Sequence, residues 1–178
     1  MIYAGASGVG TAAIQICNLL KVNAFAVVSS PSKREICMQV GAKGCVLYKN
    51  NDKWDEELIQ VNNGKRFDAL LDCVGVSNLD RTINLLDIDG RWILYGLLSG
   101  VKAEVNFMKL LQKRITLKTS LLKARSDEYK TNLIENFSEK VLPEFGTHKV
   151  KPIIDTVLQS NFENANAFIE AHQKMEKN

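Results

Sequence analysis

Short apolar segments of strand length alternate with helix-like segments along almost the whole chain. Five segments rich in aliphatic residues lie at 1–5, 23–29, 44–48, 67–73 and 91–97, and a sixth, with alternating side chains, lies at 115–121. Apolar residues at helical spacing, or a capping pair such as Ser32 with Glu35, indicate helices between them. Strands that are apolar on both faces and separated by helices favour a parallel sheet covered on both sides. The predicted fold class is α/β, a doubly wound parallel sheet of about six strands.

The last third of the sequence departs from this alternation. A longer helix is predicted at 126–144, and the composition changes at 146–148, the one plausible domain boundary. Beyond it, the pattern predicts an apolar strand at 150–158 and a helix at 160–175. The length of 178 residues suits one large domain, or one domain with a fragment of another.

The composition excludes several classes of protein. Charged residues make up 24% of the chain, the formal net charge is +3, and no basic block indicates nucleic-acid binding. No apolar run reaches the roughly 18 residues of a membrane-spanning helix, and no secretory signal is visible. The four cysteines are widely spaced and have no histidine nearby, so we expect no metal site and reduced thiols in a cytoplasmic protein, with two disulfides as the alternative.

A glycine motif follows the first apolar segment. Residues 8–13, Gly-Val-Gly-Thr-Ala-Ala, fit G-x-G-x-x-A where a strand turns into a helix. In dinucleotide-binding domains the first glycine (here Gly8) permits the tight turn, the second (Gly10) admits the pyrophosphate, and the third small residue (Ala13) packs the helix on the sheet. The helix N-terminus also offers free N–H groups to the phosphates. Small residues can pack a helix on a strand without any ligand, but the strand–turn–helix context favours a Rossmann-type dinucleotide-binding domain.

The end of the second predicted strand bears on the choice of dinucleotide. Domains selective for NAD(H) place an acidic residue there, about 20 residues after the glycines, to bind the ribose hydroxyls. This chain has Ser-Ser-Pro-Ser-Lys-Arg at 29–34 instead. Hydroxyls and an ammonium suit a 2′-phosphate, so we expect NADP(H) as the cofactor. The alternative is that Ser32 only caps a helix while Lys33 and Arg34 form a solvated face, and both interpretations can hold together.

Longer motifs are more specific than the glycines. They are AGASGVGTAAIQ at 4–15, S-x-x-K at 30–33, LLDCVG at 70–75, DGRWILYGL at 89–97 and LLQKRITLKTSLLKAR at 110–125. Together they resemble the cofactor half of the quinone oxidoreductases, the zinc-free branch of the medium-chain dehydrogenase/reductase superfamily. The resemblance covers nearly the whole chain and implies an NADPH-dependent oxidoreductase that reduces quinones or enones by hydride transfer.

The resemblance also implies a cofactor site, without assigning any catalytic residue. In that family a phosphate loop, a serine–lysine pair, a tyrosine and the loops after the last three strands surround the dinucleotide. The corresponding positions are Ser7, Gly8, Val9 and Gly10 for the pyrophosphate, Ser30 and Lys33 for the 2′-phosphate, Tyr48 for the adenosine end, and Cys73, Val74, Gly75, Gly96, Leu97, Ser120 and Leu121 for the nicotinamide side. A small buried strand residue explains Cys73 equally well, and Tyr48 could equally be a packing residue with a solvated hydroxyl.

Family members carry a barrel-like catalytic domain before this segment. The resemblance therefore implies that residues 1–147 form an NADP-binding Rossmann domain, and that residues 148–178 are a returning tail segment of an otherwise absent N-terminal catalytic domain. We expect this tail to be the least protected part of the chain, because its apolar strand lacks an obvious pairing partner.

Two functions remain open. The first is an NADPH-dependent oxidoreductase with a small-molecule quinone substrate, represented by its cofactor-binding half. The second is a dinucleotide-binding or dimerisation module without turnover as an isolated chain. A free sheet edge at 115–121 favours a homodimer, and the resemblance implies pairing at the same strand.

Overall fold

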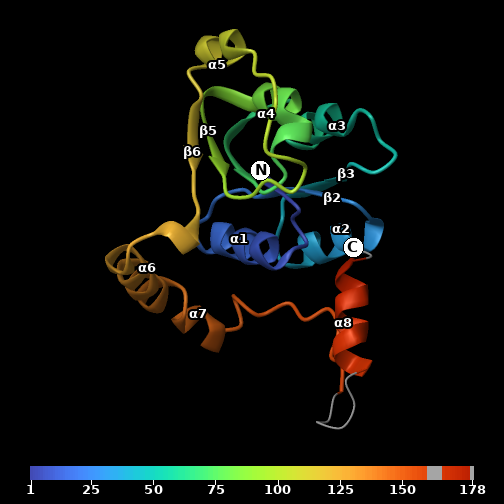
Figure 1. Cartoon of the computed structure of the whole chain (residues 1–178), viewed down its shortest axis with the longest axis vertical. Coiled ribbons are helices and arrows are strands. Elements are labelled where there is room, and N and C mark those ends of the chain that lie inside the picture. The colour runs from blue at the N-terminus through green and yellow to red at the C-terminus, as the bar shows by residue number, and fades with distance from the viewer. Residues whose placement is uncertain (160–165, 177–178) are drawn as a thin grey trace.

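The computed structural model describes residues 1–159 and 166–176, which form a six-stranded parallel sheet with helices on both faces (Figure 1). The strands are β1 (Ile2–Tyr3), β2 (Phe25–Val28), β3 (Gly44–Leu47), β4 (Phe67–Asp72), β5 (Leu86–Leu94) and β6 (Thr116–Thr119). The helices are α1 (Gly8–Leu19), α2 (Pro31–Gln39), α3 (Trp54–Val61), α4 (Leu79–Leu85), α5 (Phe107–Lys113), α6 (Asp127–Lys140), α7 (Pro143–Gly146) and α8 (Asn166–Glu176), with 3₁₀ turns η1 (Val76–Asn78) and η2 (Leu122–Ala124). The predicted α/β fold class is confirmed.

The strand order is β3-β2-β1-β4-β5-β6. The central strand β1 pairs with β2 on one side, through Ile2 opposite Ala26, and with β4 on the other, through Ile2 opposite Leu71. The direction in which the chain adds strands therefore reverses between β1 and β4. In open α/β sheets, ligands bind outside the carboxyl ends of the strands at such a reversal point.

Two apolar cores lie on opposite faces of the sheet. The core under α3 and α4 includes Tyr3, Trp54, Leu58, Leu70, Ile83 and Trp92. The core under α1 and α2 includes Ile2, Ile14, Ala26, Val28, Cys37 and Cys45. Both faces of the strands are therefore covered, which explains why β2 and β3 are almost continuously apolar in sequence.

Several element boundaries differ from the sequence prediction. The helix predicted at 126–144 is divided into α6 and α7, and Pro143 stands at the start of α7, where a missing N–H breaks no intrahelical bond. Strand β5 begins at Leu86 rather than at residue 91, because the chain passes through a left-handed turn at Asp89 (φ 62°) without leaving the sheet. The short helix α5 was not predicted; Asn106 caps it by accepting a hydrogen bond from the Met108 amide.

The predicted strand at 150–158 is wrong: residues 151–159 adopt no regular secondary structure. The tail nevertheless has a docking contact. Val150 is buried, and the Gln15 side chain of α1 accepts a hydrogen bond from the Lys151 amide (2.9 Å) and donates one to the Lys151 carbonyl (3.1 Å). The amide group of Gln15 thus pairs with the backbone as a neighbouring strand would. The predicted start of the last helix, at 160–165, lies outside the described residues.

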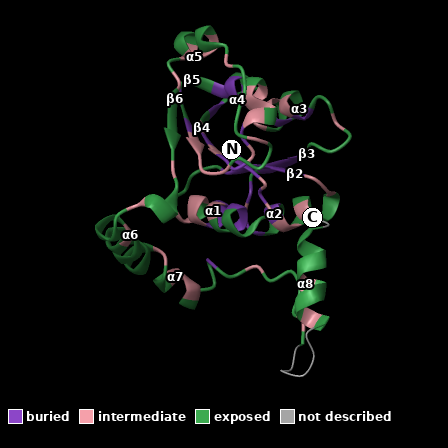
Figure 2. Cartoon of the chain, in the orientation of Figure 1, coloured by how far each residue is buried: buried purple, intermediate pink, exposed green. Residues whose placement is uncertain are grey.

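Helices α6, α7 and α8 have no buried residue in the described chain (Figure 2). Phe137 of α6 contacts Phe145 of α7 edge to face, with ring centroids 6.3 Å apart, yet Ile134 on the same helix is 63% exposed. In the tail, Ile154 and Val157 are 67% and 72% exposed. Protection within the tail is therefore expected to be confined to the segment next to Gln15.

Replacing Gln15 with leucine tests this docking contact. Gln15→Leu leaves both backbone groups of Lys151 without their partner, so amides at 150–153 should exchange faster and unfolding free energy should fall by about 1–3 kcal/mol. Hydrogen exchange by mass spectrometry, with the exposed Gln60→Leu of α3 as the matched control, measures the first effect. Unchanged exchange at 150–153 would show that Gln15 does not hold the tail.

Candidate functional site

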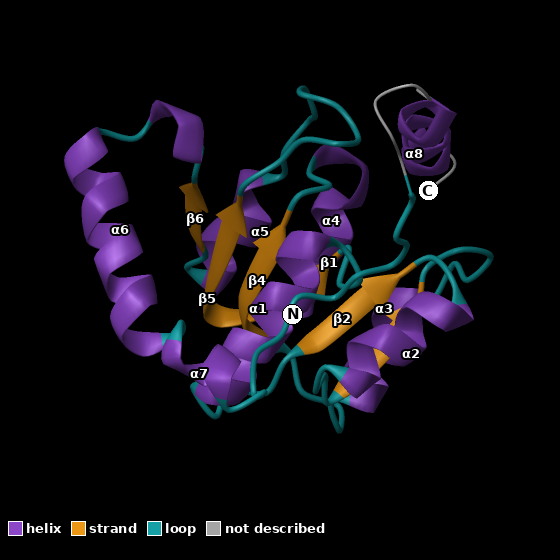
Figure 3. Cartoon of the chain, turned by 90° about the horizontal axis from the view of Figure 1, so that it is seen from below, coloured by secondary structure: helices purple, strands orange, loops and turns teal. Residues whose placement is uncertain are grey.

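All of the predicted site residues follow the carboxyl ends of the parallel strands. Residues 7–10 follow β1, residues 30–33 follow β2, Tyr48 follows β3, residues 73–75 follow β4, residues 96–97 follow β5 and residues 120–121 follow β6. Since the strands are parallel, these ends meet at one edge of the sheet, on both sides of the reversal between β1 and β4 (Figure 3). The fold thus brings the predicted residues together, although their roles in binding remain predictions.

The N-terminus of α1 opens at this edge. Ser7 is the N-cap: its Oγ accepts a hydrogen bond from the Gly10 amide (3.0 Å), and its carbonyl accepts one from the Thr11 hydroxyl (3.0 Å). The amides of Gly8 and Val9 lie in the first turn, where an N–H has no intrahelical acceptor, and both residues are exposed. Free N–H groups and the helix dipole make this turn suitable for a phosphate.

The two motif glycines differ in their surroundings. A Cβ atom at Gly10 would lie 2.4 Å from the Ala4 carbonyl oxygen and 2.5 Å from that of Gly5, so Gly10 is required where α1 packs against the end of β1. A Cβ atom at Gly8 would meet nothing within 4 Å. The position of Gly8 therefore opens onto free space, whereas that of Gly10 faces the backbone at the end of β1.

Gly5 is also required by close packing at this point of the fold. It follows β1 directly, and a Cβ atom there would lie 2.5 Å from the Ala26 Cβ of β2. Ala13 is half-buried against the core under α1, but the close approach of helix and strand is made at Gly10. The glycine pattern that matters is Gly5-x-x-Gly8-x-Gly10, and its spacing was already present in the segment at 4–15.

The loop after β2 differs from the prediction in its cap. Ser30, not Ser32, is the N-cap of α2; its Oγ accepts a hydrogen bond from the Lys33 amide (3.4 Å) and lies 3.1 Å from the Ser32 Oγ. Pro31 occupies the first helical position, where its fixed φ is favourable. Ser30 and Lys33 are therefore adjacent within one helical turn, and each is half-buried.

The sequence analysis did not consider Asp155, a carboxylate of the tail whose pKa is affected by the charge of Lys33 in this loop. Hydrogen bonds from Lys174 and Thr156, together with the charge of Lys33, lower the pKa of the Asp155 carboxyl. The Lys174 Nζ lies 2.7 Å from the Asp155 Oδ2.

The loop after β4 is tied to the loop after β5. The Leu98 amide donates a hydrogen bond to the Cys73 carbonyl (3.0 Å), and a Cβ atom at Gly96 would lie 2.9 Å from the same oxygen. Gly75 adopts φ 83° and ψ −120°, a conformation that favours glycine. These contacts fix the predicted nicotinamide-side residues Gly75 and Gly96 by backbone packing.

Cys73 is more deeply placed than a reactive thiol would be. It is 8% exposed, and burial raises the pKa of its thiol. The neighbouring Tyr95 hydroxyl is also buried and, in the described part of the chain, makes no hydrogen bond of ordinary geometry. Burial, with the adjacent Cys73, raises the pKa of Tyr95. The packing interpretation of Cys73 therefore accounts for its side chain.

The side chains of Tyr48, Leu97 and Leu121, three of the remaining predicted positions, are partly exposed to solvent. Tyr48 is 51% exposed, and its amide donates a hydrogen bond to the Val28 carbonyl (3.1 Å). Leu97 and Leu121 are 44% and 64% exposed. The Ser120 amide is held by the Leu94 carbonyl (3.0 Å). An apolar, solvent-open surface of this kind is suited to a flat ring.

Residues 1–159 and 166–176 contain neither a metal-binding cluster nor a membrane-spanning helix. No three His, Cys, Asp or Glu side chains gather there in a way that could hold a metal ion. Within the same residues, no helix is both long and apolar enough to cross a bilayer. All four cysteines are present as free thiols.

Comparison with known proteins identifies the family. A family model described as "Zinc-binding dehydrogenase" matches residues 8–139. The chain belongs to this family. The described residues nevertheless offer no ligand set that fits a zinc ion.

The relatives include quinone oxidoreductases. The chain is 28% identical over 113 residues to "Quinone oxidoreductase 1" of Escherichia coli, covering 64% of this chain and 34% of that protein. It is 28% identical over 170 residues to the "Synaptic vesicle membrane protein VAT-1 homolog" of Danio rerio, covering 88% of this chain and 35% of that protein. The chain thus spans about a third of the length of these curated relatives.

A solved structure shares the fold. The Escherichia coli quinone oxidoreductase complexed with NADPH superposes with a TM-score of 0.73 at 24% identity, over 86% of this chain and 46% of that chain. The predicted resemblance to quinone oxidoreductases of the medium-chain dehydrogenase/reductase superfamily is confirmed at the level of the family and the fold.

The contrast between the two glycines gives a prediction. Gly10→Ala should lower the free energy of unfolding by about 1–3 kcal/mol, because the new methyl group meets backbone oxygens that cannot move aside. Gly8→Ala, in open space at the start of the same helix, should change it by less than about 0.5 kcal/mol. Urea unfolding of both variants measures the difference, and equal losses would contradict the packing role of Gly10.

Proposed function

We propose that this chain provides the NADPH-binding half of an oxidoreductase that reduces quinones or related enones by hydride transfer. The observation that carries the proposal is the open first turn of α1 at Gly8, placed at the strand reversal where α/β sheets bind ligands. Membership of the dehydrogenase family and the names of the quinone oxidoreductase relatives support the reaction class.

Different residues of the site would bind different parts of the dinucleotide. The amides of Gly8 and Val9, with Ser7 holding the turn, would bind the pyrophosphate. The loop at 73–75 and Leu97 would flank the nicotinamide and exclude water from one side of it. When bound, the nicotinamide supplies the hydride, and the protein supplies orientation and electrostatics.

NADPH rather than NADH is proposed because of the segment at 30–33. It contains two hydroxyls and an ammonium within one helical turn, and no carboxylate at the end of β2 that would repel a 2′-phosphate.

Calorimetric titration with NADPH and NADH tests the cofactor proposal. Lys33→Ala should cost about 1.5–3 kcal/mol of NADPH affinity, through the loss of a charge-assisted contact, and should leave NADH nearly unchanged. Lys43→Ala, an exposed lysine just before the amino end of β3, is the matched control and should change neither affinity. Equal losses for the two cofactors in Lys33→Ala would show that this residue does not recognise the 2′-phosphate.

The second candidate function is a binding or dimerisation module without turnover. It is favoured by the outer edge of β6, which in the described sheet offers unpaired backbone groups to a second copy. Steady-state oxidation of NADPH with an ortho-quinone separates the two. Cofactor binding without oxidation supports the module, and turnover supports the enzyme.

We further propose that the chain forms a homodimer through the strand at 115–121, in the reducing environment of the cytoplasm. In the described sheet β6 pairs only with β5 and its four residues are exposed, so its outer edge offers unpaired backbone groups. Sedimentation at tens of micromolar, roughly the range where weak edge pairing shows, should give a dimer. Leu117→Lys should shift it toward monomer, while Val22→Lys, outside β6, should not.

A further inference from the structure

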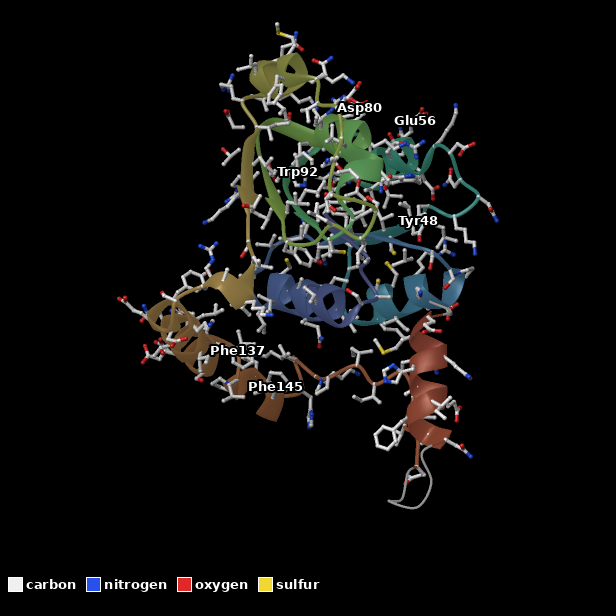
Figure 4. The ribbon with its side chains drawn as sticks, in the orientation of Figure 1. Tyr48, Glu56, Asp80, Trp92, Phe137 and Phe145 are labelled. Carbon is white, nitrogen blue, oxygen red and sulfur yellow. The ribbon has the colours of Figure 1, made fainter. Side chains whose placement is uncertain are left out.

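Asp72, the last residue of β4, carries a fully buried carboxylate. Its Oδ1 accepts hydrogen bonds from the amides of Val74 (2.7 Å) and Gly75 (2.9 Å). Its Oδ2 accepts one from the indole Nε1 of Trp92 (3.0 Å), a β5 residue that lies opposite Leu70 in the sheet; Trp92 is labelled in Figure 4. Three N–H donors thus compensate the loss of water around the charge, which would otherwise be costly at such depth.

The Asp72 carboxylate fixes the buried side of the loop at 73–75, and the exposed Ser99 fixes its other side. The Ser99 Oγ donates a hydrogen bond to the Val74 carbonyl (2.7 Å), and the Ser99 amide donates another to the same oxygen (3.0 Å). The same Oγ accepts a hydrogen bond from the Ser77 amide (3.0 Å). The loop backbone is therefore fixed on both sides, at the strand reversal.

We propose that Asp72, oriented by Trp92, is a positioning residue for the nicotinamide end of the cofactor. The inference rests on the proposed function, because it assumes that a dinucleotide lies along this edge. Asp72 cannot touch the cofactor itself, since its side chain is buried beneath the loop. It acts through Val74 and Gly75, whose amides it pulls toward the sheet, so that the outer surface of the loop keeps one position.

An amide cannot replace this carboxylate, because all three surrounding groups are donors. In Asp72→Asn the NH2 group faces either the two backbone amides or the Trp92 indole, and at least one donor loses its acceptor. Trp92→Phe removes the indole donor. In the double variant the amide oxygen can accept from the loop while the NH2 group no longer faces a second donor, so the loop regains its support.

The test compares NADPH with adenosine 2′,5′-bisphosphate, which lacks the nicotinamide, by calorimetry on the full chain. Asp72→Asn should weaken NADPH about tenfold and change the bisphosphate less than about twofold. Adding Trp92→Phe to Asp72→Asn should restore NADPH affinity to within about threefold of the parent. The exposed Ser99→Ala should weaken NADPH selectively as well, and Thr147→Ala, which loses a remote hydroxyl–carbonyl bond, should change neither ligand.

The outcomes separate this inference from the proposed function. If the parent chain binds neither ligand, the proposed function fails and the inference fails with it. If the parent binds both, but Asp72→Asn and Ser99→Ala weaken both ligands equally or leave both unchanged, the role of Asp72 is structural only and the inference alone is overturned. A double variant no better than Asp72→Asn would also overturn it.

Discussion

The close approach of α1 to the end of β1 is the contact on which the rest of the candidate site depends. It is possible because Gly10 has no side chain, so the backbone oxygens of Ala4 and Gly5 can approach the helix. This approach places the first turn of α1 at the strand reversal and leaves Gly8 facing open space. The loops after β2 and β4 then lie on either side of one helix N-terminus, as binding an extended dinucleotide requires.

The sequence predicts the sheet well because its strands are buried on both faces. Continuous apolar runs such as those of β2 and β3 have few alternatives to a covered parallel strand. The site positions came from the family resemblance, and the parallel sheet brings them to one edge. The sequence could not show the different surroundings of Gly8 and Gly10, because these follow from distances between backbone atoms of different elements.

The errors lie where long-range contacts decide the conformation. The segment at 150–158 has the apolar composition of a strand, but its backbone pairs with the side chain of Gln15 rather than with a ladder. The sequence analysis assigned no role to Asp72, and only the structure shows three donors converging on it. The acidic residue within an apolar run, LLDC, was the one available signal.

Amide chemical shifts of the chain, recorded by NMR during titration with NADPH, test the central claim most directly. If a dinucleotide binds along the carboxyl edge of the sheet, the amides of Gly8, Val9 and Gly75 should move together and saturate at one affinity. Those of Asn62 and Asn63, at the C-terminal end of α3 near the amino edge of the sheet, should stay in place. Shifts confined to the amino edge, or no shifts at all at Gly8 and Val9, would contradict the account.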